Sequence, residues 1–183
     1  MRNRAFILAV AALLPLAAAS GQEVATPSVA PRNVLSIQPI NAVLAAYSAE
    51  YERQVAAALT LGAGGTYFKS GNTVDDVTYK SGDIKLRYYP NGTALMGFSF
   101  GGSAGFSSIS GFDINGAPLS LSGPSIGVLL EYQWLLGVKR NFAVALGLGA
   151  KAVLVKDSTF SNGHSAARYP TARISVGYAF YAT

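Results

Sequence analysis

The chain has 183 residues, of which 50% are hydrophobic and only 13% are charged, so it holds one domain with much less charge than soluble domains usually carry. It has no cysteine and one histidine, which excludes a disulfide framework, a cysteine-type zinc site, an iron–sulfur cluster and a cysteine nucleophile. Without Arg2 and Arg4 the 14 basic residues become 12 against 9 acids, a charge of +3, and they do not cluster as nucleic-acid binding requires.

The first nineteen residues have the pattern of a secretory signal peptide. Arg2 and Arg4 precede an apolar run over residues 5–19, which ends in the three small alanines that signal peptidase accepts. The run is shorter than the about 20 residues that a membrane-spanning helix needs. We therefore expect residues 1–19 to be removed on export. Residues 20–32 have two prolines and no apolar periodicity, which predicts a flexible periplasmic leader.

From residue 33 onward, apolar residues recur with a period of two, which is typical of strands. Over residues 142–154 every even position is apolar, whereas the odd positions are mostly small and include one charge, Lys151. The same pattern predicts eight strands, at about 33–40, 44–54, 57–68, 79–89, 93–107, 124–137, 141–155 and 169–181.

The connections between these strands alternate in length after the first one. Three are short, at 54–56, 90–92 and 138–140, and three are longer and polar, at 69–78, 108–123 and 156–168. The Asn91-Gly92 pair is a strong hairpin signal, because both residue types tolerate positive φ. Short periplasmic turns that alternate with longer external loops are typical of outer-membrane barrels.

One face of the eight strands collects forty positions without a single charge. A lipid-facing surface must be free of charge, because Arg or Lys at the bilayer midplane costs about 2–4 kcal/mol. A soluble barrel would instead need a densely charged outer face, which this chain lacks. The apolar face is therefore expected to meet lipid, and the fold class is predicted to be an all-β, eight-stranded, antiparallel, up-and-down transmembrane β-barrel over residues 33–183.

The opposite face carries small residues and eight charges. We expect these charges to form a network in the lumen, and they are Glu50, Glu52, Asp83, Lys85, Arg87, Glu131, Lys151 and Arg173. Four acids balance four bases. This balance favours a salt-bridge lattice that plugs the barrel, and the alternative is a selective pore lining. Because Lys151 and Arg173 lie farther from the periplasmic end than the other six, we expect them to need a bound anion, water or a rearranged partner.

Aromatic residues gather on the apolar face close to the short turns and the C-terminus. They predict an interfacial girdle at headgroup depth, formed by Tyr51, Tyr88, Trp134, Phe142, Tyr178 and Phe180. Tyr67 and Phe106, near the longer loops, predict a second and thinner girdle.

Three segments resemble the small outer-membrane barrels of the OmpA, OmpX and OmpW type, and are most similar to the uncharacterised outer-membrane β-barrel domain families. They are the opening at 33–39, Glu50-Tyr-Glu-Arg53 before a short turn, and the aromatic ending at 176–181, after which Ala182 and Thr183 depart from the family pattern. The resemblance implies insertion into the outer membrane by the barrel-assembly machinery. It implies no catalytic residues, because these families share no catalytic motif.

The function favoured at this point is a non-enzymatic outer-membrane protein with a structural or surface-interaction role and a plugged lumen. A narrow channel for small or apolar solutes is the main alternative, and a lipid-modifying envelope enzyme is a third. The third rests on His164-Ser165, which are adjacent, whereas outer-membrane deacylases place His and Ser one residue apart on a strand. We expect a monomer in lipid, with no cofactor, metal or nucleic-acid partner.

Overall fold

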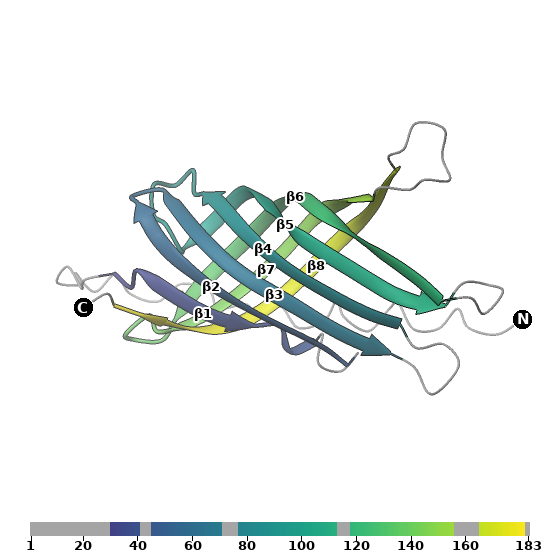
Figure 1. Cartoon of the computed structure of the whole chain (residues 1–183). Helices are drawn as coiled ribbons and strands as arrows, with labels where there is room; N and C mark the ends of the chain where they lie inside the picture. The colour runs from purple at the N-terminus through teal and green to yellow at the C-terminus, as the bar shows by residue number, and fades with distance from the viewer. Residues whose placement is uncertain (1–29, 41–44, 71–76, 113–117, 156–164, 182–183) are drawn as a thin grey trace, which may run out of the picture.

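The computed structural model describes residues 30–40, 45–70, 77–112, 118–155 and 165–181, which form a closed barrel (Figure 1). Its strands are β1 (Asn33–Ile37), β2 (Ala46–Ala56), β3 (Leu59–Ser70), β4 (Val77–Tyr88), β5 (Gly97–Phe112), β6 (Pro118–Leu136), β7 (Phe142–Val155) and β8 (Ser165–Phe180). The predicted all-β, eight-stranded, up-and-down barrel is therefore confirmed. The expected signal peptide lies outside the described residues, as does the leader up to residue 29. None of the described ranges contains a helix long and apolar enough to cross a membrane.

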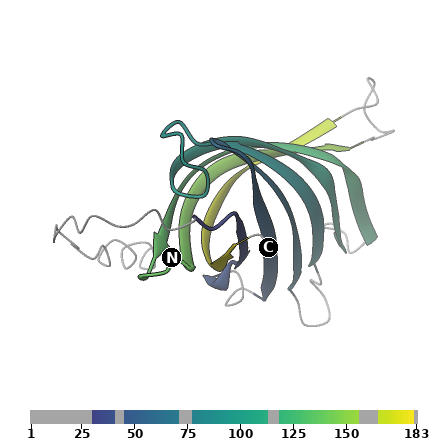
Figure 2. The same cartoon turned by 90° about the vertical axis from the view of Figure 1, so that its left-hand side faces the viewer.

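Each strand pairs antiparallel with the next, and β1 also pairs with β8, which closes the barrel. Asn33 lies opposite both Arg53 and Phe180, so the start of β1 and the ends of β2 and β8 share one end of the barrel. We call this the short-turn end, because the connections 57–58, 89–96 and 137–141 also lie there; Figure 2 views the barrel from this side. The opposite end, from which the other four connections leave, is the loop end.

β5 and β6 extend farther toward the loop end than the sequence predicts. Their register continues from Phe106 opposite Pro124 to Ser110 opposite Ser120, through residues whose Ser and Gly content favours a loop. Antiparallel pairing does not depend on the side chains here, because the ladder uses only backbone N–H and C=O groups. β8 likewise begins at Ser165 instead of 169, whereas β1 ends at Ile37 instead of 40.

The connection from β4 to β5 differs most from its prediction. The sequence predicts a tight turn over Pro90-Asn91-Gly92 with a strand from residue 93, but β5 begins only at Gly97. Ala94, which the alternation assigns to the lipid face, is buried, and so is Leu95. Leu95 has a φ of 68° and Gly97 a φ of 91°, so the chain reverses here through the left-handed region. The turn consequently folds inward at the short-turn end.

The outer face of the barrel is apolar, as the alternation predicts. Large hydrophobic side chains stand exposed on it along the strands, among them Leu61, Ile84, Leu86, Phe100, Val128, Leu130 and Leu148. All six predicted girdle residues point outward near the short-turn end, and several of their rings are in contact, such as Tyr88 with Phe100 at 5.3 Å between centroids. An exposed apolar surface of this size would drive association in water, so it is the kind of surface that other apolar matter covers.

Candidate functional site

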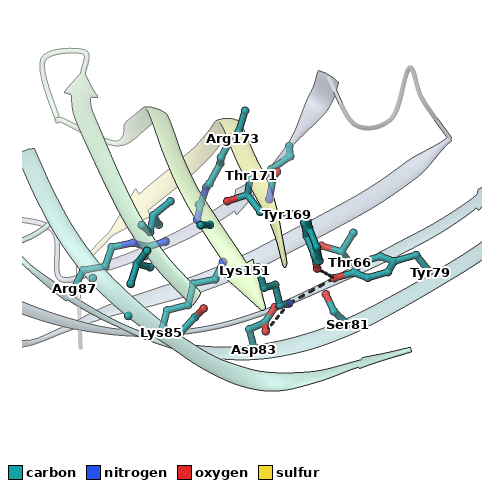
Figure 3. A pocket seen from close by; sticks show the side chains of 18 residues that line it. Thr66, Tyr79, Ser81, Asp83, Lys85, Arg87, Lys151, Tyr169, Thr171 and Arg173 are labelled. Atoms are coloured by element: carbon teal, nitrogen blue, oxygen red, sulfur yellow. Dashed lines mark hydrogen bonds and ion pairs between the residues drawn. The ribbon is translucent and has the colours of Figure 1, made fainter. Parts of the chain in front are cut away.

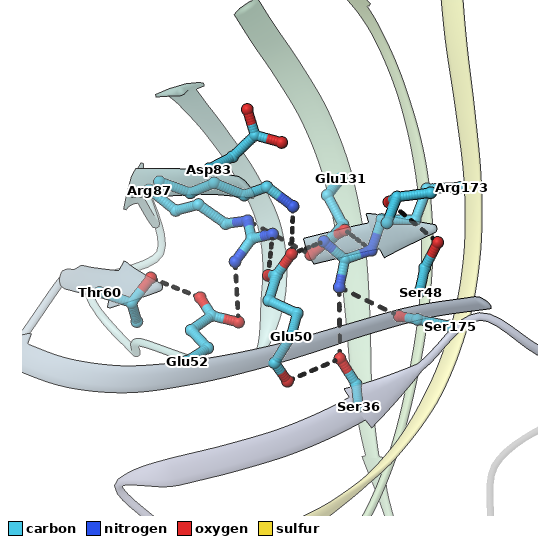
Figure 4. A network of polar contacts seen from close by, with 12 residues as sticks. Ser36, Ser48, Glu50, Glu52, Thr60, Asp83, Arg87, Glu131, Arg173 and Ser175 are labelled. Atoms are coloured by element: carbon cyan, nitrogen blue, oxygen red, sulfur yellow. Dashed lines mark hydrogen bonds and ion pairs between the residues drawn. The ribbon is translucent and has the colours of Figure 1, made fainter. Parts of the chain in front are cut away.

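The lumen contains the candidate site, because strand alternation directs every charge of the predicted network inward. The structure brings the eight residues together in two groups. Six of them form what we call the central cluster, which crosses the lumen between β2, β4, β6 and β8 (Figure 4): Glu50, Glu52, Lys85, Arg87, Glu131 and Arg173. The other two, Asp83 and Lys151, form a separate pair nearer the loop end.

Glu50 on β2 is the hub of the central cluster. Its carboxylate accepts hydrogen bonds from Arg87 at 2.5 Å, from Arg173 at 2.8 Å and from Lys85. The three cations come from two strands, β4 and β8, which are separated from β2 on opposite sides of the barrel wall. One acid therefore joins strands that do not pair with each other.

Arg87 and Arg173 connect the hub to the remaining acids. Arg87 lies 3.0 Å from Glu52 and 3.6 Å from Glu131, and Arg173 lies 3.2 Å from Glu131. The two contacts of Glu131 lack the alignment of hydrogen bonds, so its fully buried carboxylate is held by charge attraction. Three acids and three bases make the cluster neutral within itself, which is the condition for burying charges in a lumen.

Below the central cluster, the short-turn end of the lumen is closed by apolar and polar contacts. Glu52 accepts hydrogen bonds from Thr60 and from the Tyr89 hydroxyl, the latter at 3.0 Å. Leu95 of the β4–β5 turn is fully buried, and Gln133 donates a hydrogen bond to its carbonyl at 2.8 Å. A small apolar core surrounds Leu95 and consists of Val34, Ala143 and Ala179, with Leu135 packed against it. We call this assembly the turn plug.

Toward the loop end, the lumen contains a chamber with a volume of about 230 Å³ (Figure 3). Lys151 on β7 lies 2.8 Å from Asp83 on β4 at its wall. Tyr79 and Tyr169 reach across from β4 and β8, with their hydroxyls 3.1 Å apart. The central cluster forms the floor of this chamber, since Lys85, Arg87 and Arg173 all line it.

The expectation that Lys151 and Arg173 need an anion, water or a rearranged partner is wrong. Arg173 pairs with Glu50 and Glu131, and Lys151 pairs with Asp83. The reason is reach. The long side chains cross the lumen and reach acids on strands that are not their neighbours in the sheet. Strand order alone therefore does not identify these partners.

Glycines on the inner face make room for these long side chains. A Cβ on Gly101 would overlap the Leu86 carbonyl oxygen and lie 3.0 Å from Arg87 Cγ. A Cβ on Gly105 would lie 2.5 Å from the Asp83 carboxylate. The glycine content of the inner face is thus explained by close approach of charged neighbours.

Several lumen residues that carry no charge are not part of the predicted network. Tyr79 and Tyr89 continue the odd-numbered inward series of Asp83, Lys85 and Arg87, so alternation alone could have found them. Tyr169 precedes Arg173 with the same parity and could have been found in the same way. Leu95 gives no such signal, because it lies in a turn.

For the third alternative, an envelope enzyme, the described residues show no arrangement of His164 and Ser165. His164 lies outside the described residues, and Ser165 is the first residue of β8. Within the described ranges, no group of three or more His, Asp or Glu side chains is arranged to hold a metal ion.

Comparison with known proteins gives one structural likeness. No family model matches the chain, and no curated protein matches it. Among solved structures, the chain is similar to the N-terminal β-barrel domain of Pseudomonas aeruginosa OprF, with 17% identity and a TM-score of 0.46, over 83% of this chain and all of that domain. This likeness concerns the fold alone. By its own strand topology and apolar exterior, the chain is a small eight-stranded β-barrel of the outer-membrane type.

Proposed function

We propose that this protein is a non-enzymatic, monomeric β-barrel of the outer membrane with a structural or surface-interaction role and a lumen closed to ions. In this proposal residues 1–19 direct export, the barrel-assembly machinery inserts the chain, and lipid covers the apolar outer face. The observation that carries it is the central cluster. It crosses the lumen, is neutral within itself and is buried, so it offers a passing ion neither space nor net charge.

The turn plug supports the same function. Leu95 and its apolar neighbours fill the short-turn end of the lumen directly below the central cluster. A solute would have to displace both layers to pass. The main alternative, a narrow channel, therefore needs both layers to open.

Planar-bilayer conductance of the refolded full chain tests the closed lumen. Folding is first checked by gel mobility, because a closed barrel resists SDS without heating, so the unboiled and boiled samples should migrate differently. We expect the wild type to insert and give no steady current. A steady, ion-selective current that changes selectivity in Glu131→Ala without loss of barrel stability would establish the channel instead.

Location is tested separately by cell fractionation. We expect recovery in the outer-membrane fraction together with heat-modifiable mobility. Recovery in the soluble periplasmic fraction, with identical mobility before and after boiling, would overturn the membrane assignment.

A further inference from the structure

The chamber above the central cluster has a use that a closed, structural barrel does not require. It has a volume of about 230 Å³, far more than the about 10–15 Å³ that one water needs. Charged and hydroxyl side chains line it from β3, β4, β7 and β8 (Figure 3). We propose that this chamber is a binding site for a small soluble oxyanion, a phosphate or a small carboxylate.

The charge that the chamber presents is mainly positive, although the lumen as a whole is neutral. Lys85 leaves 19% of its side-chain surface exposed, whereas its partner Glu50 leaves 2%. Arg173 leaves 8% exposed and Glu131 none. The acids of the central cluster thus lie beneath the bases, and a molecule in the chamber meets N–H donors first.

Among the residues that the structure describes, Asp83 is the one acid that lines the chamber, and its charge is already paired. Lys151 lies 2.8 Å from its carboxylate, and the Ser125 hydroxyl donates to it at 3.4 Å. Its repulsion of an anion is therefore offset by the ammonium group directly beside it.

Lys85 is the donor best placed to bind the anion. Its partner Glu50 also receives Arg87 and Arg173, so three cations share one carboxylate and Lys85 is the most exposed of them. Because Glu50 is shared, it neutralises Lys85 only in part, and an oxyanion beside Lys85 would complete the neutralisation. Hydroxyl donors stand around the same space, namely Thr66, Tyr79, Ser81 and Thr171. Charge-assisted and hydroxyl hydrogen bonds together are the donors that phosphate and carboxylate oxygens accept.

The position of the chamber selects a soluble ligand. It lies inside the barrel wall, whereas lipid headgroups meet the outer face. The central cluster and the turn plug close it toward the short-turn end, so the anion enters from the loop end. The Tyr79–Tyr169 contact lies on that path and is made by two hydroxyls, which can turn toward a ligand oxygen.

Calorimetric titration of the refolded full chain tests the site. The detergent is a non-ionic maltoside, because phosphocholine detergents carry the group being tested. Inorganic phosphate, acetate and chloride are titrated at equal ionic strength. We expect phosphate or acetate to saturate one site per chain and chloride to give no saturation, and the tighter of the two oxyanions identifies the ligand class.

Two variants locate the site. Lys85→Met should weaken oxyanion binding at least tenfold, whereas the matched control Lys80→Met, on the same strand but facing outward, should bind as the wild type does. Ser81→Leu fills the chamber without removing a charge and should abolish binding, which keeps the test valid if Lys85→Met does not fold. Absence of saturation by both oxyanions, equal binding of chloride, or equal weakening by Lys80→Met would overturn the proposal.

Discussion

Arg173 on β8 donates a hydrogen bond to Glu50 on β2 at 2.8 Å, although 123 residues separate them along the chain. β1 lies between their strands and pairs with each through only five residues. Ser36 of β1 lies beneath the pair, since it donates to the Glu50 carbonyl at 3.5 Å and accepts from Arg173 at 3.4 Å. The ion pair therefore spans the strand that closes the barrel and joins its two neighbours.

Arg173→Met should weaken this closure. The substitution keeps most of the apolar stem but removes the guanidinium, so the central cluster is left with one excess buried negative charge. We expect a loss of about 3 kcal/mol or more, as for other buried pairs that lose one partner. The measurement is the temperature at which the unboiled gel band converts to the unfolded one. Arg168→Met, an exposed position on the same strand, is the control, and equal conversion temperatures in all three proteins would contradict the prediction.

Glu131→Ala removes one of the two acids that Arg87 and Arg173 both contact, the other being Glu50. We expect it to destabilise the barrel by about 3–5 kcal/mol if the cluster is dry, and by less if water enters. Urea unfolding in detergent micelles measures the free energy. Combining it with Arg173→Met restores neutrality, so the double variant should lose less than the sum of the single losses. Strict additivity would show that the two residues are not coupled.

Gly101→Ala should be destabilising through backbone overlap. The new methyl group would meet the Leu86 carbonyl and the Arg87 side chain, so the two strands must move apart or Arg87 must leave its partners. We expect a cost of about 1–3 kcal/mol, which is typical of overpacking. Gly82→Ala is the matched control, because nothing lies within 4 Å of its added Cβ. If Gly101→Ala and Gly82→Ala destabilise the barrel equally, the effect comes from strand flexibility and not from packing.

Leu95 offers a test of the turn plug. Leu95→Ala should cost about 2–4 kcal/mol, because it empties a fully buried position. Leu95→Gly loses the same contacts but relieves the left-handed φ of 68°, a conformation that costs non-glycine residues about 1–2 kcal/mol. We therefore expect the glycine variant to be no less stable than the alanine variant in urea unfolding. If Leu95→Ala lowers the free energy of unfolding by less than about 0.5 kcal/mol, as a substitution in an exposed turn would, the turn plug is contradicted.

Orientation in the membrane can be measured on intact cells. In an even-stranded barrel both termini lie on one side, so we expect the short-turn end to face the periplasm. A protease site inserted at Gly116 or Gly163, in the longer connections, should be cleaved from outside. The same site at Gly92, in the β4–β5 turn, should be protected until the envelope is opened. The reverse pattern would show an inverted topology.

The faces of the strands could be predicted because lipid imposes one rule on a whole surface. Almost every outward position between the two ends of the barrel must be apolar, so a period of two distinguishes the lumen side of a strand from its outer side without knowledge of partners. The eight lumen charges followed from this rule alone. Lys80 also points outward, but it is not among the forty charge-free positions. It is exposed near the loop end, with its ammonium group 5.8 Å from the Tyr67 ring centroid.

The pairing of the charges and the shape of the β4–β5 turn could not be predicted in the same way. Which acid Arg173 reaches depends on the tilt and stagger of the closed barrel, which no single strand encodes. The Asn91-Gly92 pair gives a valid turn signal, but the burial of Leu95 depends on the space left by Ala143 and Ala179 across the lumen. The strand ends at the loop end also extend beyond their prediction, because Ser and Gly form the backbone ladder as well as apolar residues do.

The outward charges on opposite sides of the barrel lie at different heights. On β4, Lys80 stands eight residues from the girdle residue Tyr88, which at about 3.3 Å per residue and a tilt of about 40° is about 20 Å along the membrane normal. On β8, Arg168 stands twelve residues from Phe180, which is about 30 Å by the same geometry. Measured from the girdle residue of the same strand, the uncharged outer span is therefore shorter on β4 than on β8. If the barrel is inserted as proposed, this difference would require the lipid to thin locally at β4 or the barrel axis to lean until the two basic residues reach the same depth.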